Sequence, residues 1–297
     1  MYAHADASAT GRADTTGPRS KLVTVSYSLA EVLQVCEALW PASGAESWDA
    51  SGLIAGHPDD RVSRVVLAVD AVEVTVRDAV DTGADLLLVH HPLLLRGVTS
   101  IAADEYKGAM LTRLIRSGCA LLAAHTNADV VDEGTSGALA ARLGLVDLAP
   151  IAPSADPSVG IGRVGRLANP VSLGHLAQAL ARILPATATG IRVAGDYDAV
   201  VERVALCGGA GDSLLAAPSV VSADVYITSD LRHHPASAAR EQAQLGDGRP
   251  YLIDVSHWAS EWLWLDGAAA SLGERLPELD ISVSDLRTDP WDFVVTQ

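Results

Sequence analysis

Cysteine is scarce in this chain, and its arrangement excludes two common kinds of site. The 297 residues include three cysteines, Cys36, Cys119 and Cys207, and no two of them form a C-x-x-C pair. Disulfide frameworks and thiolate zinc sites both depend on characteristic sets of paired cysteines. We therefore expect three small, buried apolar side chains and no cage of sulfur ligands.

Long apolar runs are also missing. Charged residues or glycine interrupt every apolar stretch before the roughly 18 residues that a membrane span needs, and no charged-then-apolar leader opens the chain. We therefore expect a cytoplasmic protein that does not enter a membrane.

Basic residues are few. Lys+Arg number 21 against 37 for Asp+Glu, which leaves a formal net charge of −16. Such a charge repels polyanions, so the composition disfavours nucleic acid as a partner. A small anionic substrate remains compatible with the sequence, because Arg96, Lys107 and Arg232 lie close to the motifs described below.

The chain does contain an alternation of short apolar strands and amphipathic helices. The apolar pattern predicts strands over 64–70, 84–91 and 119–125, with helices over 71–83 and 106–118 between them. Crossover helices between short apolar strands indicate a parallel sheet that is covered on both faces. Sheets of this kind bind ligands at the carboxyl ends of their strands.

A second α/β unit follows, with predicted helices over 172–184 and 234–244 and strands between and after them. Candidate ligands occur in the first half and in the last fifty or so residues, so we expect the two chain ends to fold together. The predicted organisation is a disordered tail, a first α/β lobe and a second α/β lobe. They span 1–20, 21–132 completed by 255–297, and 133–254, respectively.

Three pairs of potential metal ligands stand at predicted strand ends. They are His90 with His91, His125 with Asp129, and His257 with Glu261. The first pair closes the apolar run DLLLVHHPLLL, where both imidazoles can turn toward one site. The other two pairs are spaced i, i+4, which places both side chains on one face of a helical turn.

Each pair has an ordinary explanation when it is taken alone. Adjacent histidines can hydrogen-bond within a loop, Asp129 is typical of a strand-to-helix cap, and Glu261 is typical of a first helical turn. Together, four imidazoles and two carboxylates exceed the needs of one tetrahedral zinc ion and predict two divalent ions bridged by a carboxylate and a water or hydroxide. These ligand types exclude calcium and favour zinc, iron or manganese, with cobalt and nickel also compatible.

Further polar residues lie near the same strand ends. In TSDLRHHP, Asp230 and His234 could carry protons or orient a ligand imidazole, or they could simply form a capped helix start. The glycines of residues 208–212 could bind an anion, although a plain turn fits better without a Walker lysine. Asp49 in SWDASGL either approaches the site or caps a turn.

Five motifs, in order, carry a family resemblance: SWDASGL, VHHPLLL, AHTNAD, TSDLRHH and IDVSHWASE. From residue 22 onward the chain resembles the GTP cyclohydrolase I type 2 homologues, the NIF-three-like dinuclear-metal proteins. The resemblance implies a two-lobed α/β subunit with mixed or parallel sheets covered by helices. It also implies a toroidal homohexamer with a dinuclear metal site between the lobes.

The resemblance also implies roles for individual residues. The implied metal ligands are His90, His91, His125, Asp129, His257 and Glu261. Asp129 and Glu261 are the implied bridging carboxylates, and Asp230 and His234 match residues that line the family's site and take the catalytic roles here.

From these residues we expect a metal-dependent hydrolase in which two ions lower the pKa of a water to give hydroxide near neutral pH. The resemblance implies GTP as the substrate, attacked at the imidazole ring of its purine with release of formate. The alternative is a non-catalytic metal-binding scaffold or regulatory protein. Six ligands shared by two ions leave open coordination positions, which favours the enzyme.

Overall fold

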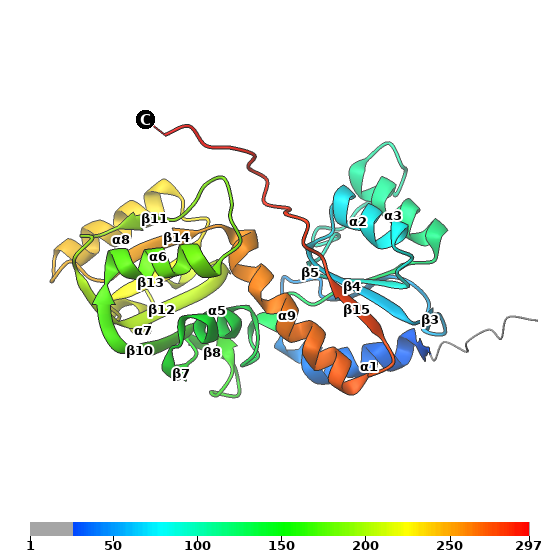
Figure 1. Ribbon diagram of the computed structural model, residues 1–297, viewed down its shortest axis with the longest axis horizontal. Coiled ribbons are helices and arrows are strands. Elements are labelled where there is room, and N and C mark those ends of the chain that lie inside the picture. The colour runs from blue at the N-terminus through cyan, green and yellow to red at the C-terminus, as the bar shows by residue number, and fades with distance from the viewer. Residues whose placement is uncertain (1–25, 297) are drawn as a thin grey trace, which may run out of the picture.

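The computed structural model describes residues 26–296, and this part of the chain forms two α/β lobes, each built on one large mixed sheet (Figure 1). The mixed α/β fold class is thereby confirmed. The predicted tail, residues 1–20, lies outside the described residues. In the described range, no helix is both long enough and apolar enough to cross a membrane.

The sheet of the first lobe has five strands in the order β15-β4-β5-β6-β2. Their bounds are β15 Asp280–Val283, β4 Arg64–Asp70, β5 Leu86–His91, β6 Ala120–Ala123 and β2 Gly52–Ala55. Strands β15, β4, β5 and β6 are parallel, and β2 is antiparallel to β6. Strand β15, which comes from the C-terminal part of the chain, therefore completes a sheet whose other strands come from the N-terminal part.

Helices cover both faces of this sheet (Figure 1). They are α1 Leu29–Leu39, α2 Glu73–Asp81, α3 Tyr106–Ser117 and α9 His257–Arg275. Successive residues of a strand point to opposite faces. In β4, Leu67 accordingly joins the core shared with α1 and α9, whereas Val66 joins the core shared with α2 and α3. Strands buried on both faces explain why the sequence shows uninterrupted apolar runs here.

The sheet of the second lobe has six strands in the order β11-β14-β13-β12-β10-β7. Their bounds are β11 Arg192–Ala194, β14 Tyr251–Val255, β13 Val225–Ser229, β12 Val200–Ala210, β10 Arg163–Ser172 and β7 Val146–Ala149. Strands β12, β13 and β14 are parallel, and the outer strands pair antiparallel. The parallel centre therefore has three strand ends that point the same way.

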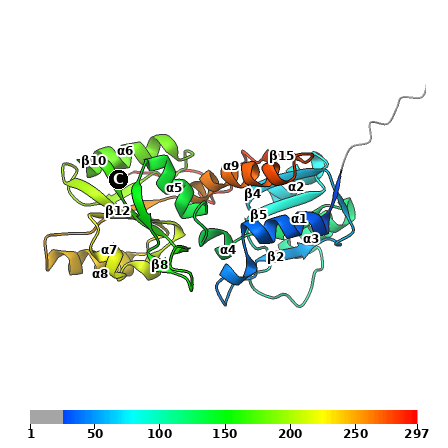
Figure 2. The ribbon, with the colours of Figure 1, turned by 90° about the horizontal axis from the view of Figure 1, so that it is seen from below.

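Figure 2 shows the helices of the second lobe above and below its sheet. They are α5 Thr135–Leu143, α6 Leu173–Ile183, α7 Pro218–Val221 and α8 His233–Gln244. Helices α5 and α6 share a core with Leu206 of β12, and α7 and α8 pack on the side of Ala205. The remaining elements are short: β1 Tyr27–Ser28, β3 Arg61–Val62, β8 Ala152–Pro153, β9 Gly160–Ile161, α4 Thr126–Asp129, and the 3-10 turns Ala42–Gly44 and Asp212–Leu214.

Helix α9 connects the two lobes. It contacts α5 and β12 in the second lobe and α1, β4 and β15 in the first. Near its middle, the buried Trp264 lies with its ring centroid 5.3 Å from that of Trp40 and 5.5 Å from that of His90. The core is therefore continuous from one lobe to the other through α9. The lobe limits expected from the sequence, at residues 132 and 255, stay a prediction.

Replacement of Trp264 by alanine tests the role of α9 in joining the lobes. Trp264 is 1 % exposed, and we expect Trp264→Ala to lower the free energy of unfolding by about 3–5 kcal/mol, the usual cost of emptying a buried tryptophan site. Trp291→Ala is the control, because Trp291 is 61 % exposed. Urea unfolding measures both, and a loss below about 1 kcal/mol for Trp264→Ala would contradict this packing.

Candidate metal centre

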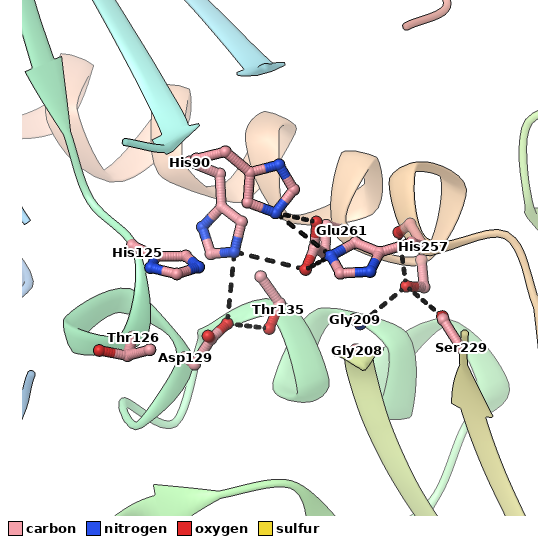
Figure 3. Close-up of polar contacts among 12 residues, drawn as sticks. His90, His125, Thr126, Asp129, Thr135, Gly208, Gly209, Ser229, His257 and Glu261 are labelled. Carbon is pink, nitrogen blue, oxygen red and sulfur yellow. Dashed lines mark hydrogen bonds and ion pairs between the residues drawn. The ribbon is translucent and has the colours of Figure 1, made fainter. Parts of the chain in front are cut away.

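The predicted ligand pairs meet where the two lobes face each other. His90 and His91 end β5, His125 precedes α4, and Asp129 ends α4. His257 is the first residue of α9, and Glu261 follows one turn later. Figure 3 shows the side chains of His90, His125, Asp129, His257 and Glu261 directed toward a common space. The structure therefore brings together all six residues that the sequence indicated as ligands.

Glu261 lies at the centre of this group. Its Oε1 is 2.9 Å from Nε2 of His257 and 3.5 Å from Nε2 of His90, and its Oε2 is 3.0 Å from Nε2 of His91. The Nε2 atoms of His91 and His257 are 3.2 Å apart. One carboxylate thus contacts three imidazoles, two from the end of β5 and one from the start of α9.

The other ring nitrogen of each of the four histidines in the cluster has a partner. Nδ1 lies 2.7–2.8 Å from an oxygen in each case: Ala124 O for His90, Asp70 for His91, Asp49 for His125 and Asp230 for His257. Such a partner fixes the ring orientation and leaves Nε2 as the free ligand atom. The four Nε2 atoms therefore point inward, as metal-binding histidines require.

Asp129 lies at one side of the group. Its Oδ1 is 3.7 Å from Nε2 of His90 and accepts a hydrogen bond from the hydroxyl of Thr135. Burial raises the pKa of this carboxyl group. The positive charge of His90 lowers the pKa, and the negative charge of Glu261 raises it.

The backbone that follows Asp129 is held by Arg163. Its guanidinium donates to the carbonyls of Val130 and Val131.

The residues present fit a metal ion. The cluster contains two groups of three residues, and within each group the ligand atoms all lie within 4.8 Å of one another. The groups are His90, His91 and His125, and His91, His257 and Glu261. The buried Nε2 of His90 has no hydrogen-bond partner among the described residues, and a buried polar atom without a partner is unfavourable. A cation in this space would satisfy that atom and the charge of Glu261 together.

In the metal-free site, the charge of Glu261 and the charges of the neighbouring histidines stabilise one another. Burial lowers the pKa of His91, but the charge of Glu261 and hydrogen bonds to Asp70 and Glu261 outweigh it and raise that pKa to about 10. The same balance, with Asp230 in place of Asp70, raises the pKa of His257 to about 11. Burial opposes ionisation of Glu261, yet the three histidines hold its pKa well below the usual range.

Gly209 lies directly against the cluster (Figure 3). A Cβ at this position would lie 2.3 Å from Oε1 of Glu261 and 3.3 Å from Nε2 of His257, and the backbone φ is +73°. The sequence favoured a plain turn for residues 208–212, and this prediction is wrong for Gly208 and Gly209. Both lie in β12, where the pairing with β13 shifts register. The lack of a side chain at Gly209 gives Glu261 its space, and a Cβ at Gly208 would instead meet Thr135.

Asp49 and Asp70 were not among the residues assigned to the site from sequence. Asp49 was left open, and its carboxylate accepts from the backbone N–H of Thr126 at 3.0 Å besides contacting His125. Asp70 was missed, although it ends β4 and lies opposite His91 in the parallel register. An acidic residue that closes the neighbouring strand is the signal that could have found it.

The two predicted catalytic residues lie in different surroundings. Asp230 follows β13 with a left-handed φ of 57° and contacts Nδ1 of His257 at 2.7 Å. His234 is exposed at the start of α8, with its ring centroid 5.2 Å from that of His233. No hydrogen bond or ion pair joins His234 to the cluster among the described residues. Asp230 therefore orients the imidazole of His257, and the catalytic roles of Asp230 and His234 stay a prediction.

The fold and the cluster define a two-lobed α/β protein with a buried histidine–carboxylate group suited to metal. The sequence model of the Duf34/NIF3 (NGG1p interacting factor 3) family matches residues 27–290, so this chain belongs to that family. A GTP cyclohydrolase 1 type 2 homolog of Streptomyces coelicolor is 48 % identical over 270 residues, which cover 89 % of this chain and 93 % of the relative. The homolog of Mycobacterium tuberculosis is 35 % identical, covering 91 % and 98 %.

Solved structures agree with this assignment. A Staphylococcus aureus protein superposes with a TM-score of 0.80 at 26 % identity, covering 90 % of this chain and 99 % of that chain. A Bacillus cereus protein related to NIF3 superposes with a TM-score of 0.82 at 23 % identity, covering the same shares of the two chains. The second likeness supports the fold alone.

Replacement of Gly209 by alanine tests the close approach of β12 to Glu261. The added methyl group must displace the carboxylate, so we expect the affinity for Zn²⁺ to fall about tenfold or more. Gly267→Ala in α9 is the matched control, because nothing lies within 4 Å of its Cβ position. Zinc titration against a chromophoric chelator measures both affinities. Equal zinc affinities in the two variants would contradict the close approach of Gly209 to Glu261.

Proton release on metal binding tests the charge state of the site. With pKa values raised to about 10 and 11, His91 and His257 are protonated at pH 7 in the metal-free protein. An ion needs neutral imidazoles, so we expect binding at pH 7 to release at least about two protons and the affinity to rise with pH. Calorimetry in buffers of different ionisation enthalpy measures this number. Binding heats independent of the buffer would contradict it.

Proposed function

We propose that this chain is a dinuclear metal-dependent hydrolase that acts on a nucleotide. The observation that supports two ions is the position of Glu261, whose carboxylate lies within 3.5 Å of the Nε2 atoms of His90, His91 and His257. The two groups of ligand atoms overlap at His91, with Glu261 beside it. A carboxylate between two sets of imidazoles is suited to bridging a pair of ions.

The proposed assignment divides the two adjacent histidines of β5 between the two ions. One ion would be held by His90, His125 and Asp129, the other by His91 and His257, with Glu261 between them. Zinc, iron and manganese all suit this mixture of imidazole and carboxylate. Divalent ions at this place would supply the Lewis acidity that hydrolysis needs.

Asp230 and His234 are the proposed proton carriers. Asp230 holds the Nδ1 side of His257, and its own side chain is 62 % exposed. The carboxylate can therefore keep Nε2 of His257 directed at Glu261 while it exchanges protons with solvent. His234, at the exposed start of α8, is the second candidate, acting on a substrate that extends over that helix.

Exposure of the ligands indicates where a substrate would approach. The side chains of His90 and Glu261 are 0 % and 4 % exposed, whereas those of His91 and His257 are 26 % and 29 % exposed. The site is therefore open on the side of His91 and His257. Catalytic centres keep such an open position, and structural centres close it.

The proposed substrate is GTP or a related nucleotide. Support comes from the curated relatives, which carry the name GTP cyclohydrolase 1 type 2 homolog. Hydrolysis would open the imidazole ring of the purine and release formate. The ring-shaped homohexamer and the cytoplasmic location belong to the same proposal, and the net charge of −16 disfavours nucleic acid as a partner.

The second candidate is a non-catalytic metal-binding scaffold. The observation that favours it is the complete burial of His90 beside Glu261, because a deeply held ion exchanges slowly and suits storage or structure. Turnover separates the two candidates.

Formate release from GTP tests the proposed reaction. We expect the metal-loaded protein to release formate, and Asp129→Ala and Glu261→Ala to lose at least about 100-fold of this activity because each removes a ligand. Glu274→Ala, an exposed change on the same helix as Glu261, is the control and keeps the activity. A coupled formate assay beside elemental analysis measures both properties. Metal-loaded protein without formate release would favour the scaffold, and equal release in Glu261→Ala would refute the assignment of this site.

A further inference from the structure

The chain continues past β15 across the candidate metal centre. Figure 1 shows the segment after β15 leaving the first lobe and running over the beginning of α9 toward the second lobe. The indole Nε1 of Trp262 donates to the carbonyl of Ser284 at 3.0 Å, and the backbone N–H of Ser284 donates to Leu67 O at 2.8 Å. The start of the segment is therefore fixed to both α9 and β4.

Thr288 in this segment touches a residue that orients a candidate ligand. Its hydroxyl donates to Oδ2 of Asp70, and Oδ1 of the same carboxylate lies 2.7 Å from Nδ1 of His91. A carboxylate held at both oxygens cannot rotate about its Cβ–Cγ bond without losing a hydrogen bond. Thr288 therefore fixes the plane of Asp70, and Asp70 fixes the direction in which His91 presents Nε2.

The next residue, Asp289, reaches the residue that precedes the other partly exposed histidine of the cluster. Its Oδ1 accepts a hydrogen bond from the hydroxyl of Ser256 at 3.4 Å. Ser256 is the N-cap of α9 and directly precedes His257. Oδ2 of Asp289 is buried and has no hydrogen-bond partner among the described residues. A buried oxygen without a partner is unusual, and this one belongs to a residue that is tied to the start of α9 through Ser256.

We propose that Thr288 and Asp289 are positioning residues that brace His91 and His257 from the side away from Glu261. The Nε2 atoms of these two histidines are 3.2 Å apart, so a small rotation of either ring changes the space available to an ion. Thr288 acts on His91 through one shared carboxylate, and Asp289 acts on His257 through the helix start. This role rests on the proposed metal centre and concerns residues outside the six candidate ligands.

The direct test is zinc binding by Thr288→Val, which keeps the shape of the side chain and removes the hydroxyl. Metal-free protein is titrated with Zn²⁺ in competition with a chromophoric chelator. We expect about tenfold weaker binding of one ion in Thr288→Val, with binding restored in Thr288→Ser, which regains the hydroxyl. Zinc affinity of Thr288→Val equal to that of the wild type would overturn the proposal.

A double variant tests whether the effect passes through Asp70. We expect Asp70→Ala to weaken zinc binding by itself, and Thr288→Val to add nothing further in the Asp70→Ala background. We also expect the thermal unfolding of metal-free Thr288→Val to match that of the metal-free wild type. Additive losses of zinc affinity, or a general loss of stability with unchanged affinity, would assign Thr288 a purely structural role and overturn the proposal.

Asp289 is tested against a neighbour with the same charge. Asp289→Ala and Asp285→Ala remove one negative charge each, and Asp285 is exposed. We expect weaker zinc binding in Asp289→Ala alone, and equal affinities in the two variants would remove Asp289 from the proposal. Zinc binding is measured without substrate, so a wild type that releases no formate would refute the hydrolase and leave the outcome for Thr288 and Asp289 unaffected.

Discussion

The carboxylate of Glu261 is buried among the Nε2 atoms of three histidines. These contacts form only because helix α9, which carries Glu261, packs against both lobes. A negative charge in a position 3 % exposed is unfavourable unless cations compensate for it. Without a metal, His91 and His257 provide the compensating positive charge, because their raised pKa values favour the protonated imidazoles. With a metal ion in place, the same imidazoles would be neutral ligands. A metal ion bound here would therefore replace protons around one fixed carboxylate.

Several distant parts of the chain are needed to build this environment. Strand β5 delivers His90 and His91, the turn after β6 delivers His125, and α9 delivers His257 with Glu261. Helix α9 packs against both lobes, so the position of Glu261 depends on the continuous core around Trp264. Gly209 of β12 then allows the second sheet to approach the carboxylate without a clash.

Much of this could be predicted from the sequence, because the main signals are local. Apolar runs gave the parallel strands, and the pairs at their ends gave all six residues of the cluster. The missing parts arise from contacts between segments far apart in the chain. The antiparallel strands β2, β7 and β10 were not foreseen, since their pairing partners define them. The contact of Asp70 with His91 and the register shift at Gly209 depend on which strands are neighbours in the sheet. No single segment of the sequence shows which strands are neighbours.

Anomalous diffraction from crystals of the protein, purified and crystallised without added metal, tests the central claim most directly. Data collected above and below the absorption edges of zinc, iron and manganese locate each ion and identify its element. The account predicts two anomalous peaks per chain beside Glu261, one toward His90 and His125 and one toward His91 and His257. Crystals soaked in zinc that show no peak at this cluster, or a single peak away from Glu261, would contradict it.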